Sequence, residues 1–525
     1  MRPGPRTKPL LAVLLLAASA CWLVRRVDVQ GSPRSEDMVR SPVKAHLIDG
    51  STVVYPNGLT LSQDTLRGEG TRFDLALRNP TRTLTIPLDS VVGLEAFRTR
   101  LDEGRTILYS TLTSVVIPVA AVAIACAIDP KCFGSCPTYY SDSSGTAVLE
   151  AEGFSYSIAP LFESRDVDRL RAGPRADGSV RLEVRNEAFE THYLNQLELL
   201  EVRHGADELA LTDQWNRPLV VRGLAPSVVA RDRGGRDVRR ELATADGRLF
   251  RTVPARLAAA APGDLDDWIT IAVPAPSPPS PPSALDSVAL VFRMRNSLLT
   301  TVLLYDVMLG DQGAGALDWV GQELDRIGSA VAVGQWYAHR LGLGIAVRGP
   351  DGAYHEVARV RDTGPVAWKD VAVVIPVLER DSVRVRLSFA ADNWRIDRVA
   401  VAVSERRPDA LHHPLSAVRD AEERLDSTAR AGLADADGHY LQTFPGQRFT
   451  AVFDVGSAPA DSARTFLLVS QGYYIEWQRR AWLQGPRRAE RFEPSDGALY
   501  TAIARWRATQ RDLERQFFAT RVPVR

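Results

Sequence analysis

Three of the four cysteines lie close together in the sequence, at Cys126, Cys132 and Cys136. In an exported chain a close pair of this kind would be oxidised. The segment Cys132-Phe-Gly-Ser-Cys136 can close a short ring if a turn brings the two Cα atoms within about 7 Å. The chain lacks the two Cys-x-x-Cys pairs, or the histidines at ligand spacing, that a zinc site needs. We therefore predict one disulfide between Cys132 and Cys136, and the alternatives are pairing through Cys126 or free buried thiols.

Two acidic clusters have residue types that bind calcium, a hard cation that takes several carboxylate oxygens. Glu163, Asp166 and Asp168 fall within six residues, but the arginines beside them favour a solvated, locally paired loop. The segment Asp435-Ala436-Asp437-Gly438 resembles the start of a calcium loop, yet Tyr440 stands where such a loop needs glycine. A tight turn explains that segment better. We predict no metal site and no cofactor.

Short catalytic motifs are missing from the sequence. It contains no His-Glu-x-x-His, no Gly-x-Ser-x-Gly and no phosphate-binding Gly-x-x-x-x-Gly-Lys. His412 and His413 are adjacent, and on a helix neighbours diverge by roughly 100°, so they cannot both bind one ion unaided. We predict no catalytic residue and favour a protein that is not an enzyme. The rival is a glycan hydrolase whose carboxylates converge only in three dimensions.

Aromatic residues in and near the β-rich regions are the candidate ligand-binding groups, because sugars stack on the faces of Trp and Tyr. The candidates are Trp336, Tyr337, Trp394, Tyr473, Tyr474 and Trp477. The alternative is that these side chains only pack the core or a strand face. Jelly-roll sandwiches do carry glycan sites, which is an analogy at the level of the fold.

The amino terminus has the order of a secretory signal, with Arg2, Arg6 and Lys8 followed by the apolar residues 10–20. The run ends Ala-Ser-Ala-Cys, which resembles a bacterial lipoprotein cleavage box with Cys21 as the lipidated first mature residue. Leucine is usual where this box has alanine, and the apolar run continues to residue 24. A plain signal, an uncleaved anchor and a cytosolic protein are the alternatives.

A second apolar stretch, residues 106–128, has no charged side chain and is long enough to cross a bilayer. Pro118 lies within it, and several Ser, Thr and Ala residues lower its summed insertion energy. The two interpretations are a transmembrane helix and a buried or membrane-hugging hairpin.

The composition excludes one class of partner and supports a packed fold. The 525 residues carry 64 basic and 64 acidic side chains, so the net charge is zero and a nucleic-acid partner is not expected. Apolar residues make up 45% of the chain, too many for general disorder. Only four of the basic residues are lysines.

The elements that must position these residues are mostly strands. In residues 382–389, Val383, Val385, Leu387 and Phe389 alternate with polar residues, the pattern of a sheet with one solvated face. Asn57-Gly58 predicts a type I′ hairpin. The proline-rich residues 274–283 read as a loop within one sandwich or an interdomain linker.

Helical periodicity occurs in three regions. Leu317, Val320, Leu324 and Ile327 predict a short amphipathic helix, and residues 414–432 are helix-like. Near the end of the chain, helical spacing places five apolar side chains on one face of residues 495–520. These are Leu499, Ile503, Trp506, Leu513 and Phe517.

Together these patterns predict a mainly β protein with several units. We expect a small N-terminal β-barrel or sandwich, a central β domain, a jelly-roll-like β-sandwich, and a C-terminal α+β region that ends in an amphipathic helix. The expected boundaries are a leader or anchor at 1–30, a small β domain at 40–105, the hydrophobic segment at 106–128, a β-rich domain at 129–250, the sandwich at 251–405, and the α+β region at 406–525.

Several strings carry a resemblance to a known group of proteins. DPKCFGSCPTYY, RNEAFETHYLNQLELLEV, GPVAWKDVAVVIPV, DNWRIDRVAVAV and GYYIEW occur between residues 129 and 477. They resemble a poorly characterised family of bacterial cell-envelope lipoproteins with a Cys-Pro β-segment followed by a β-sandwich. The resemblance implies a location and a fold but transfers no activity, ligand or functional residue.

We therefore expect a lipid-anchored cell-envelope protein that faces the periplasm or cell surface and acts by binding or scaffolding. Its expected partners are the membrane and an envelope protein or glycan. Two alternatives stay open: a glycan-active enzyme or glycan-binding protein whose site forms only in three dimensions, and an integral subunit of a membrane complex.

Overall fold

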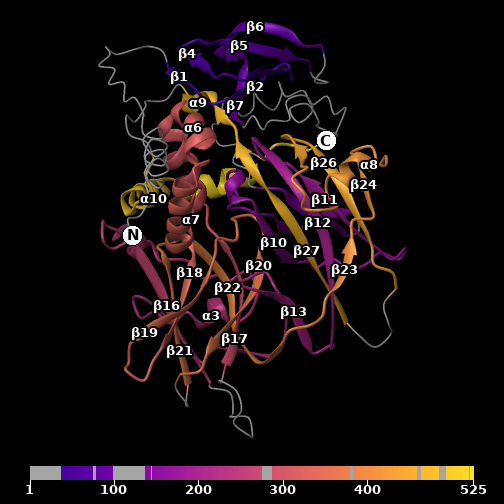
Figure 1. The fold of residues 1–525 in the computed structure, drawn as a ribbon. Coiled ribbons are helices and arrows are strands. Elements are labelled where there is room, and N and C mark those ends of the chain that lie inside the picture. The colour runs from indigo at the N-terminus through magenta and orange to yellow at the C-terminus, as the bar shows by residue number, and fades with distance from the viewer. Residues whose placement is uncertain are drawn as a thin grey trace, which may run out of the picture.

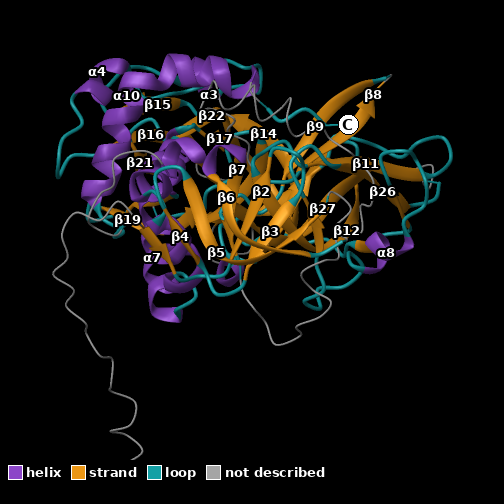
Figure 2. Ribbon diagram, turned by 90° about the horizontal axis from the view of Figure 1, so that it is seen from above, coloured by secondary structure: helices purple, strands orange, loops and turns teal. Residues whose placement is uncertain are grey.

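The protein is mainly β, as predicted, and its strands form several sheets and a closed barrel (Figure 1). The computed structural model describes residues 37–74, 79–97, 136–143, 145–274, 287–378, 382–457, 463–483, 492–519 and 521–524. Within these ranges most helical turns gather at one side of the molecule, and α8 lies apart from them (Figure 2).

The N-terminal sheet has the strand order β1-β4-β5-β3-β2-β7-β28, and β6 also pairs with β5. Its strands are β1 (Asp37–Val39), β2 (Val43–Leu47), β3 (Thr52–Tyr55), β4 (Leu59–Leu61), β5 (Thr65–Phe73), β6 (Thr81–Pro87), β7 (Val91–Ala96) and β28 (Gln478–Arg479). The last of these comes from the C-terminal part of the chain. A Cβ at Gly93 would lie 2.9 Å from the Cβ of Trp477, so glycine is required where β28 pairs with β7.

The turn at Asn57-Gly58 exists, but the predicted type I′ hairpin is wrong. β3 and β4 both pair with β5 and not with each other. Gly58 has a φ of +78°, whereas Asn57 is not among the residues of positive φ, which a type I′ turn requires at both positions. A Cβ at Gly58 would lie 2.2 Å from the carbonyl oxygen of Val39, so the backbone of β1 occupies that space.

The first sandwich packs two sheets over one core of apolar side chains. One sheet has the order β24-β26-β11-β8-β9 and the other β10-β27-β12-β23, with β25 also on β12. Their strands are β8 (Thr138–Ser143), β9 (Thr146–Glu152), β10 (Ser164–Arg169), β11 (Ser179–Arg185), β12 (Glu190–His204), β23 (Leu411–Pro414), β24 (Ala417–Arg419), β25 (Leu441–Thr443), β26 (Arg448–Asp454) and β27 (Ala463–Glu476). Strands from residues 411–476 thus complete sheets begun by residues 138–204.

The second sandwich is the jelly-roll-like unit, in which the barrel β13-β14-β22-β17-β20 packs against the sheet β15-β16-β21-β18-β19, called sheet E below. Its strands are β13 (Glu208–Asp213), β14 (Pro218–Pro226), β15 (Val229–Asp232), β16 (Asp266–Pro274), β17 (Ser287–Asn296), β18 (Leu343–Arg348), β19 (Tyr354–Val360), β20 (Lys369–Pro376), β21 (Ser382–Ala390) and β22 (Trp394–Arg406). The alternation predicted for β21 is confirmed, with Val383, Val385, Leu387 and Phe389 buried in the shared core.

The strands on either side of the proline-rich tract, β16 and β17, both contribute to this core, as expected for a loop inside one sandwich. Residues 275–286 lie outside the described part of the chain.

A helical layer covers one end of the sandwiches. It contains α4 (Pro254–Ala258), α5 (Leu299–Thr301), a π-helix (Val302–Leu309), α6 (Gly315–Asp318), a second π-helix (Trp319–Glu323), α7 (Ile327–Leu341), α9 (Arg480–Leu483) and α10 (Asp496–Ala519), whereas α3 (Arg239–Leu242) and α8 (Ser427–Ala431) lie elsewhere. The apolar face predicted for the last helix is confirmed, because its five named side chains are all buried in one core. The Trp506 Nε1 also donates to Asp392 Oδ2 at 2.8 Å.

Two helix predictions need correction. Residues 414–432 contain strand β24 and only the short helix α8, because Asp420 accepts the backbone N–H of Arg424 and closes a turn that ends the strand. In the 317–327 region, Leu317 is buried on α6 and Leu324 is buried just after the second π-helix, but Ile327 starts α7 and is exposed.

Several sequence predictions fall outside the described residues, namely the N-terminal leader with Cys21, the apolar segment 106–128, and Cys126 and Cys132. Among the helices that are described, none has the length and apolar character needed to cross a membrane.

Candidate functional site

Strand β10 of the first sandwich lies beside β13 and β20 of the second (Figure 1). Residues of these strands and of the loops next to them line a cavity of about 300 Å³. We call it the interface pocket. It is lined by Tyr156, Ser164–Asp166, Asp213–Asn216, Val360–Thr363, Lys369 and Val371. Junctions between packed units are common places for ligand sites, because neither unit alone has to fill the space.

A buried ion-pair cluster reaches the interface pocket through Asp166 and Lys369, whereas its third member, Asp168, is not part of the pocket lining. Asp166 and Asp168 alternate along β10, so both carboxylates point to the same side of the strand. Lys369, the first residue of β20, places its Nζ 3.1 Å from Asp168 Oδ1 and also bonds Asp166. Burial, together with the charge of Asp166, raises the pKa of Asp168 to about 7 despite the opposing effect of Lys369.

One wall is the turn between β13 and β14, which presents Trp215 to solvent. Asp213 Oδ1 accepts the backbone N–H groups of Trp215 and Arg217, each at 2.9 Å, and fixes the turn. Asn216 has a φ of +59° and donates its side-chain amide to the Arg165 carbonyl at 3.0 Å. The indole is therefore 62% exposed although its backbone is held on both sides.

Another wall is the loop after β19, whose backbone is also held by side-chain hydrogen bonds. Asn296 Oδ1 accepts the backbone N–H of Thr363 at 2.8 Å, and Asp362 Oδ1 accepts that of Gly364 at 2.9 Å. Burial raises the pKa of Asp362 to about 6, against the hydrogen bonds from Gly364 and Ser155. A carboxyl with a raised pKa beside a cavity is a common feature of functional sites.

Two arginines border the pocket, Arg165 on β10 and Arg361 after β19, and both are exposed. The guanidinium of Arg361 lies 6.0 Å from the centre of the Tyr156 ring. Within the described ranges neither arginine has an acidic partner, so both can donate to a ligand. The site thus offers an aromatic face, hydroxyls, amides, carboxylates and guanidinium groups around one cavity.

The predicted acidic cluster is divided by the fold. Glu163 does not join Asp166 and Asp168, because it accepts bonds from Asn195 at 2.6 Å and Tyr440 at 2.6 Å. The expectation of a solvated loop is wrong, since Asp166 and Asp168 are buried on a strand against Lys369. The described residues contain no group of three or more side chains suited to hold a metal ion.

The adjacent histidines lie on strand β23 rather than on a helix. His412 Nδ1 is 2.6 Å from Glu198 Oε1, and His413 Nε2 is 2.9 Å from Glu201 Oε2, both across the pairing with β12. Each histidine therefore has its own carboxylate.

The aromatic candidates are spread over separate cores and do not form one surface. Trp394 is fully buried and donates from Nε1 to the Leu341 carbonyl at 3.1 Å. Tyr473 stacks on Tyr193 with ring centres 4.6 Å apart, and Trp477 stacks on His46 at 3.7 Å. Of the other candidates, Trp336 and Tyr337 pack against the core of the helical layer, and Tyr474 is fully buried.

Cys136 is buried just before β8, in a backbone conformation with a φ of +21°. Burial raises the pKa of its thiol, and the nearby Glu190 adds to this effect. Cys136 has no cysteine partner within the described ranges, and its predicted partner Cys132 lies outside them.

Two more buried carboxyl groups, those of Glu95 and Glu190, have pKa values shifted in opposite directions. Burial opposes ionisation of Glu95, but the charge of Lys44 and hydrogen bonds from His46 and Tyr193 lower its pKa to about 2. Burial raises the pKa of Glu190, which bonds His192 Nε2 at 2.7 Å, and burial lowers the pKa of that histidine to about 3. The Glu190–His192 contact is therefore a hydrogen bond between neutral groups at neutral pH. Both clusters are enclosed by protein.

Sequence reasoning missed Trp215, Arg361 and Lys369. Trp215 carried a usable signal, since a tryptophan within Asp-Gln-Trp-Asn-Arg-Pro stands in a turn-like segment where burial is unexpected. Lys369 is one of only four lysines. Its meeting with Asp166, 203 positions away, has no local signal.

Comparisons with known proteins give no assignment. No family model matches the sequence, and a search of curated proteins finds no match. Among solved structures, an α-xylosidase of glycoside hydrolase family 31 from Xanthomonas citri aligns over 82% of this chain and 38% of its own length, at 8% identity and a TM-score of 0.16. A Listeria monocytogenes protein of unknown function aligns over 71% and 29%, at 10% identity and a TM-score of 0.14. The chain thus spans well under half the length of either, and these scores are too low for an inference about fold or function.

Proposed function

We propose that this protein is a carbohydrate-binding protein of the bacterial cell envelope whose ligand site is the interface pocket. One observation carries the proposal: Trp215 is 62% exposed on a turn that Asp213 holds rigid, beside a cavity lined with polar side chains. A rigid exposed indole gives a flat apolar face for a sugar ring and loses little conformational freedom on binding. The side chains around it match the hydroxyl groups of a sugar.

Binding is favoured over hydrolysis by the state of Asp166 and Asp168, of which only Asp166 lines the pocket. A retaining glycosidase needs one carboxylate free to attack and a second to donate a proton. Lys369 bonds both Asp166 and Asp168, and all three side chains are nearly buried. The ammonium group of Lys369 therefore occupies the two carboxylates that glycoside hydrolysis would use. A hydrolase is the second candidate function, because Asp362 lines the pocket and burial raises its pKa to about 6.

The envelope location remains part of the proposal and rests on the sequence. A cleaved leader with lipidated Cys21 would attach the chain to a membrane and leave the β-sandwiches facing the periplasm or cell surface. Residues 106–128 offer the alternative of an integral span. Detergent phase partitioning of Cys21→Ser distinguishes the two, because only the span keeps this variant in the detergent phase.

The binding proposal is tested with a glycan array on the wild type and the Trp215→Ala variant. We expect selective signals from the wild type that Trp215→Ala loses, with its thermal unfolding unchanged. Trp336→Ala is the matched control, since this tryptophan packs against the helical core and lies outside the pocket. The proposal would be contradicted if Trp215→Ala gave the same array signals as the wild type, or if the wild type gave no signal. Release of reducing sugar from a bound glycan would favour the hydrolase instead.

A further inference from the structure

The outer face of sheet E carries a group of arginines on a floor of small side chains. The inner face of the sheet packs on the barrel, while Arg231, Arg348, Arg384 and Arg386 point outward. Register places Arg231, Thr270, Arg386, Ala346 and Glu356 in one row across the five strands. Thr270 and Ala346 have small side chains, so the arginine side chains extend further from the sheet than these neighbours in the row.

The central arginine is held by two aromatic rings. The guanidinium of Arg386 lies 4.2 Å from the ring centre of Tyr354 and 5.4 Å from that of Trp268. Its Nε atom is buried without a hydrogen-bond partner. Contacts with two rings fix the position of the guanidinium group but leave its charge unneutralised.

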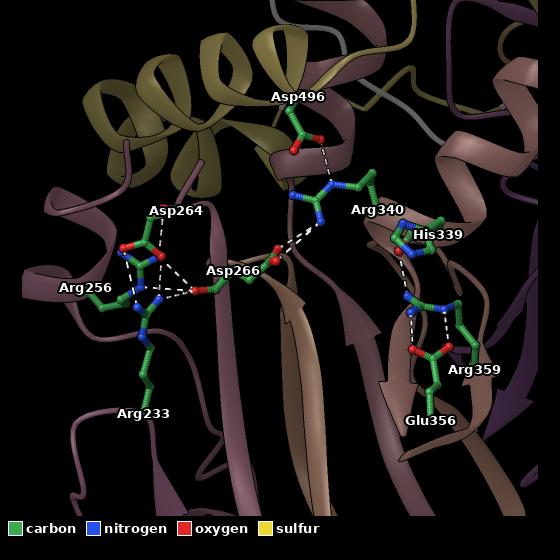
Figure 3. Close-up of polar contacts among 9 residues, drawn as sticks. All are labelled: Arg233, Arg256, Asp264, Asp266, His339, Arg340, Glu356, Arg359 and Asp496. Carbon is green, nitrogen blue, oxygen red and sulfur yellow. Dashed lines mark hydrogen bonds and ion pairs between the residues drawn. The ribbon is translucent and has the colours of Figure 1, made fainter. Parts of the chain in front are cut away.

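The acidic side chains near this face are engaged at its edge. Figure 3 shows Asp264 between Arg233 and Arg256, at 2.7 and 2.9 Å, and Glu356 paired with Arg359 at 2.6 Å. Asp266 and Asp496 both bind Arg340, at 3.1 and 2.8 Å, which ties α7 to β16 and α10 (Figure 3). These pairs neutralise the edge and leave the centre of the face positive.

Arg384 and Arg386 have no acidic partner within the described ranges. Arg231 and Arg348 donate to carbonyl oxygens in their own turns, and the charge of Arg231 also acts on the nearby Asp237, which pairs with Arg239. Four basic groups thus share one open face of a chain whose net charge is zero. Successive outward positions on a strand are about 7 Å apart, and adjacent strands about 4.8 Å. Such spacing suits an extended ligand with repeated negative charges.

We propose that the outer face of sheet E binds an acidic polysaccharide, whose carboxylates pair with Arg384, Arg386, Arg231 and Arg348. Charge complementarity is the argument, because guanidinium groups bond carboxylates in pairs and hold them better than lysines do. The choice of a polysaccharide over other polyanions rests on the proposed function. The face lies on the opposite side of sheet E from the barrel, so it can hold a long chain while the interface pocket holds one or a few sugars.

The test measures binding of polygalacturonate by the purified protein, compared with neutral dextran, polyglutamate and vesicles containing anionic lipid. We expect the protein to bind polygalacturonate more tightly than polyglutamate, and we expect this affinity to fall as the salt concentration rises. The Arg384→Ala/Arg386→Ala variant should bind polygalacturonate about tenfold or more weakly than the wild type does. The Arg181→Ala/Arg424→Ala variant is the charge-matched control, because these arginines pair locally with Asp177 and Asp420. It should bind as the wild type does.

The result separates this inference from the proposed function. Loss of polygalacturonate binding in Arg384→Ala/Arg386→Ala but not in Trp215→Ala supports a second surface. Loss only in Trp215→Ala would place the acidic glycan in the interface pocket and overturn the inference. Equal or tighter binding of polyglutamate or of anionic vesicles, or no binding of polygalacturonate, would overturn it too.

Discussion

Lys369 on β20 lies 3.1 Å from the Asp168 carboxylate on β10, and this ion pair joins the two sandwiches next to the interface pocket, which Lys369 lines. Asp166 on the same strand bonds the same ammonium group. Lys369 therefore lines the pocket and also joins the two sandwiches, which Arg169 on β10 and Asp370 on β20 link as well, at 3.4 Å.

Lys369→Met should destabilise the protein by about 3–5 kcal/mol near pH 8, because it leaves two buried carboxylates without a counter-charge. The loss should be smaller at pH 5, since the raised pKa of Asp168 allows it to be protonated there. Urea unfolding at both pH values measures this. Adding Asp168→Asn to Lys369→Met should recover part of the stability at pH 8, and a loss that does not change with pH would contradict the assignment.

The buried carboxyl of Glu190 should make the free energy of unfolding fall at high pH. Burial raises its pKa from 4.5 to about 8, so the folded state holds the proton more tightly than the unfolded state. This contribution is fully present below about pH 4.5 and is lost as pH rises through 8. Glu190 shares a hydrogen bond with the buried Glu476, whose pKa is also raised. Glu190→Gln removes one of these two carboxyls, so it should lose less stability between pH 6 and 9 than the wild type. Equal losses in urea unfolding would show that Glu190 is charged in the folded protein.

Trp506 should anchor α10 to the second sandwich. Trp506→Ala should cost about 3–5 kcal/mol, because it empties a buried site. Trp506→Phe should cost less, about 1–2 kcal/mol, since it keeps most of the packing but removes the donor to Asp392. Chemical denaturation compares the two. A full loss in Trp506→Phe would mean that the hydrogen bond, and not the packing, holds the helix.

Cys136 should be unreactive in the folded protein, because burial raises the pKa of its thiol and excludes reagents. In a Cys21→Ser/Cys126→Ser/Cys132→Ser variant, iodoacetamide should label Cys136 about a hundredfold or more slowly than in urea. Fast labelling under native conditions would contradict its buried position. Mass spectrometry of the unreduced wild type then tests the predicted disulfide with Cys132.

The sequence predicted features that depend on local patterns. Val383, Val385, Leu387 and Phe389 alternate because one face of β21 is buried, and the helical spacing of Trp506 and its neighbours reflects one apolar face. Both patterns are complete within a single element.

Features that depend on distant partners were missed. Asp166 and Asp168 beside two arginines suggest a solvated loop, and only the folded chain brings Lys369 to them. The region after Pro414 has helix-like spacing, but β24 pairs with β26 because that edge of the sheet is available. The interface pocket is formed by residues from three separate parts of the chain, so its position could not be predicted.

The most direct measurement is a crystal structure of the protein with the oligosaccharide that gives the strongest array signal. The proposed function predicts a sugar ring stacked on the Trp215 indole, with its hydroxyl groups bonded to side chains of the interface pocket. An oligosaccharide bound elsewhere, with the indole of Trp215 still facing solvent, would contradict it.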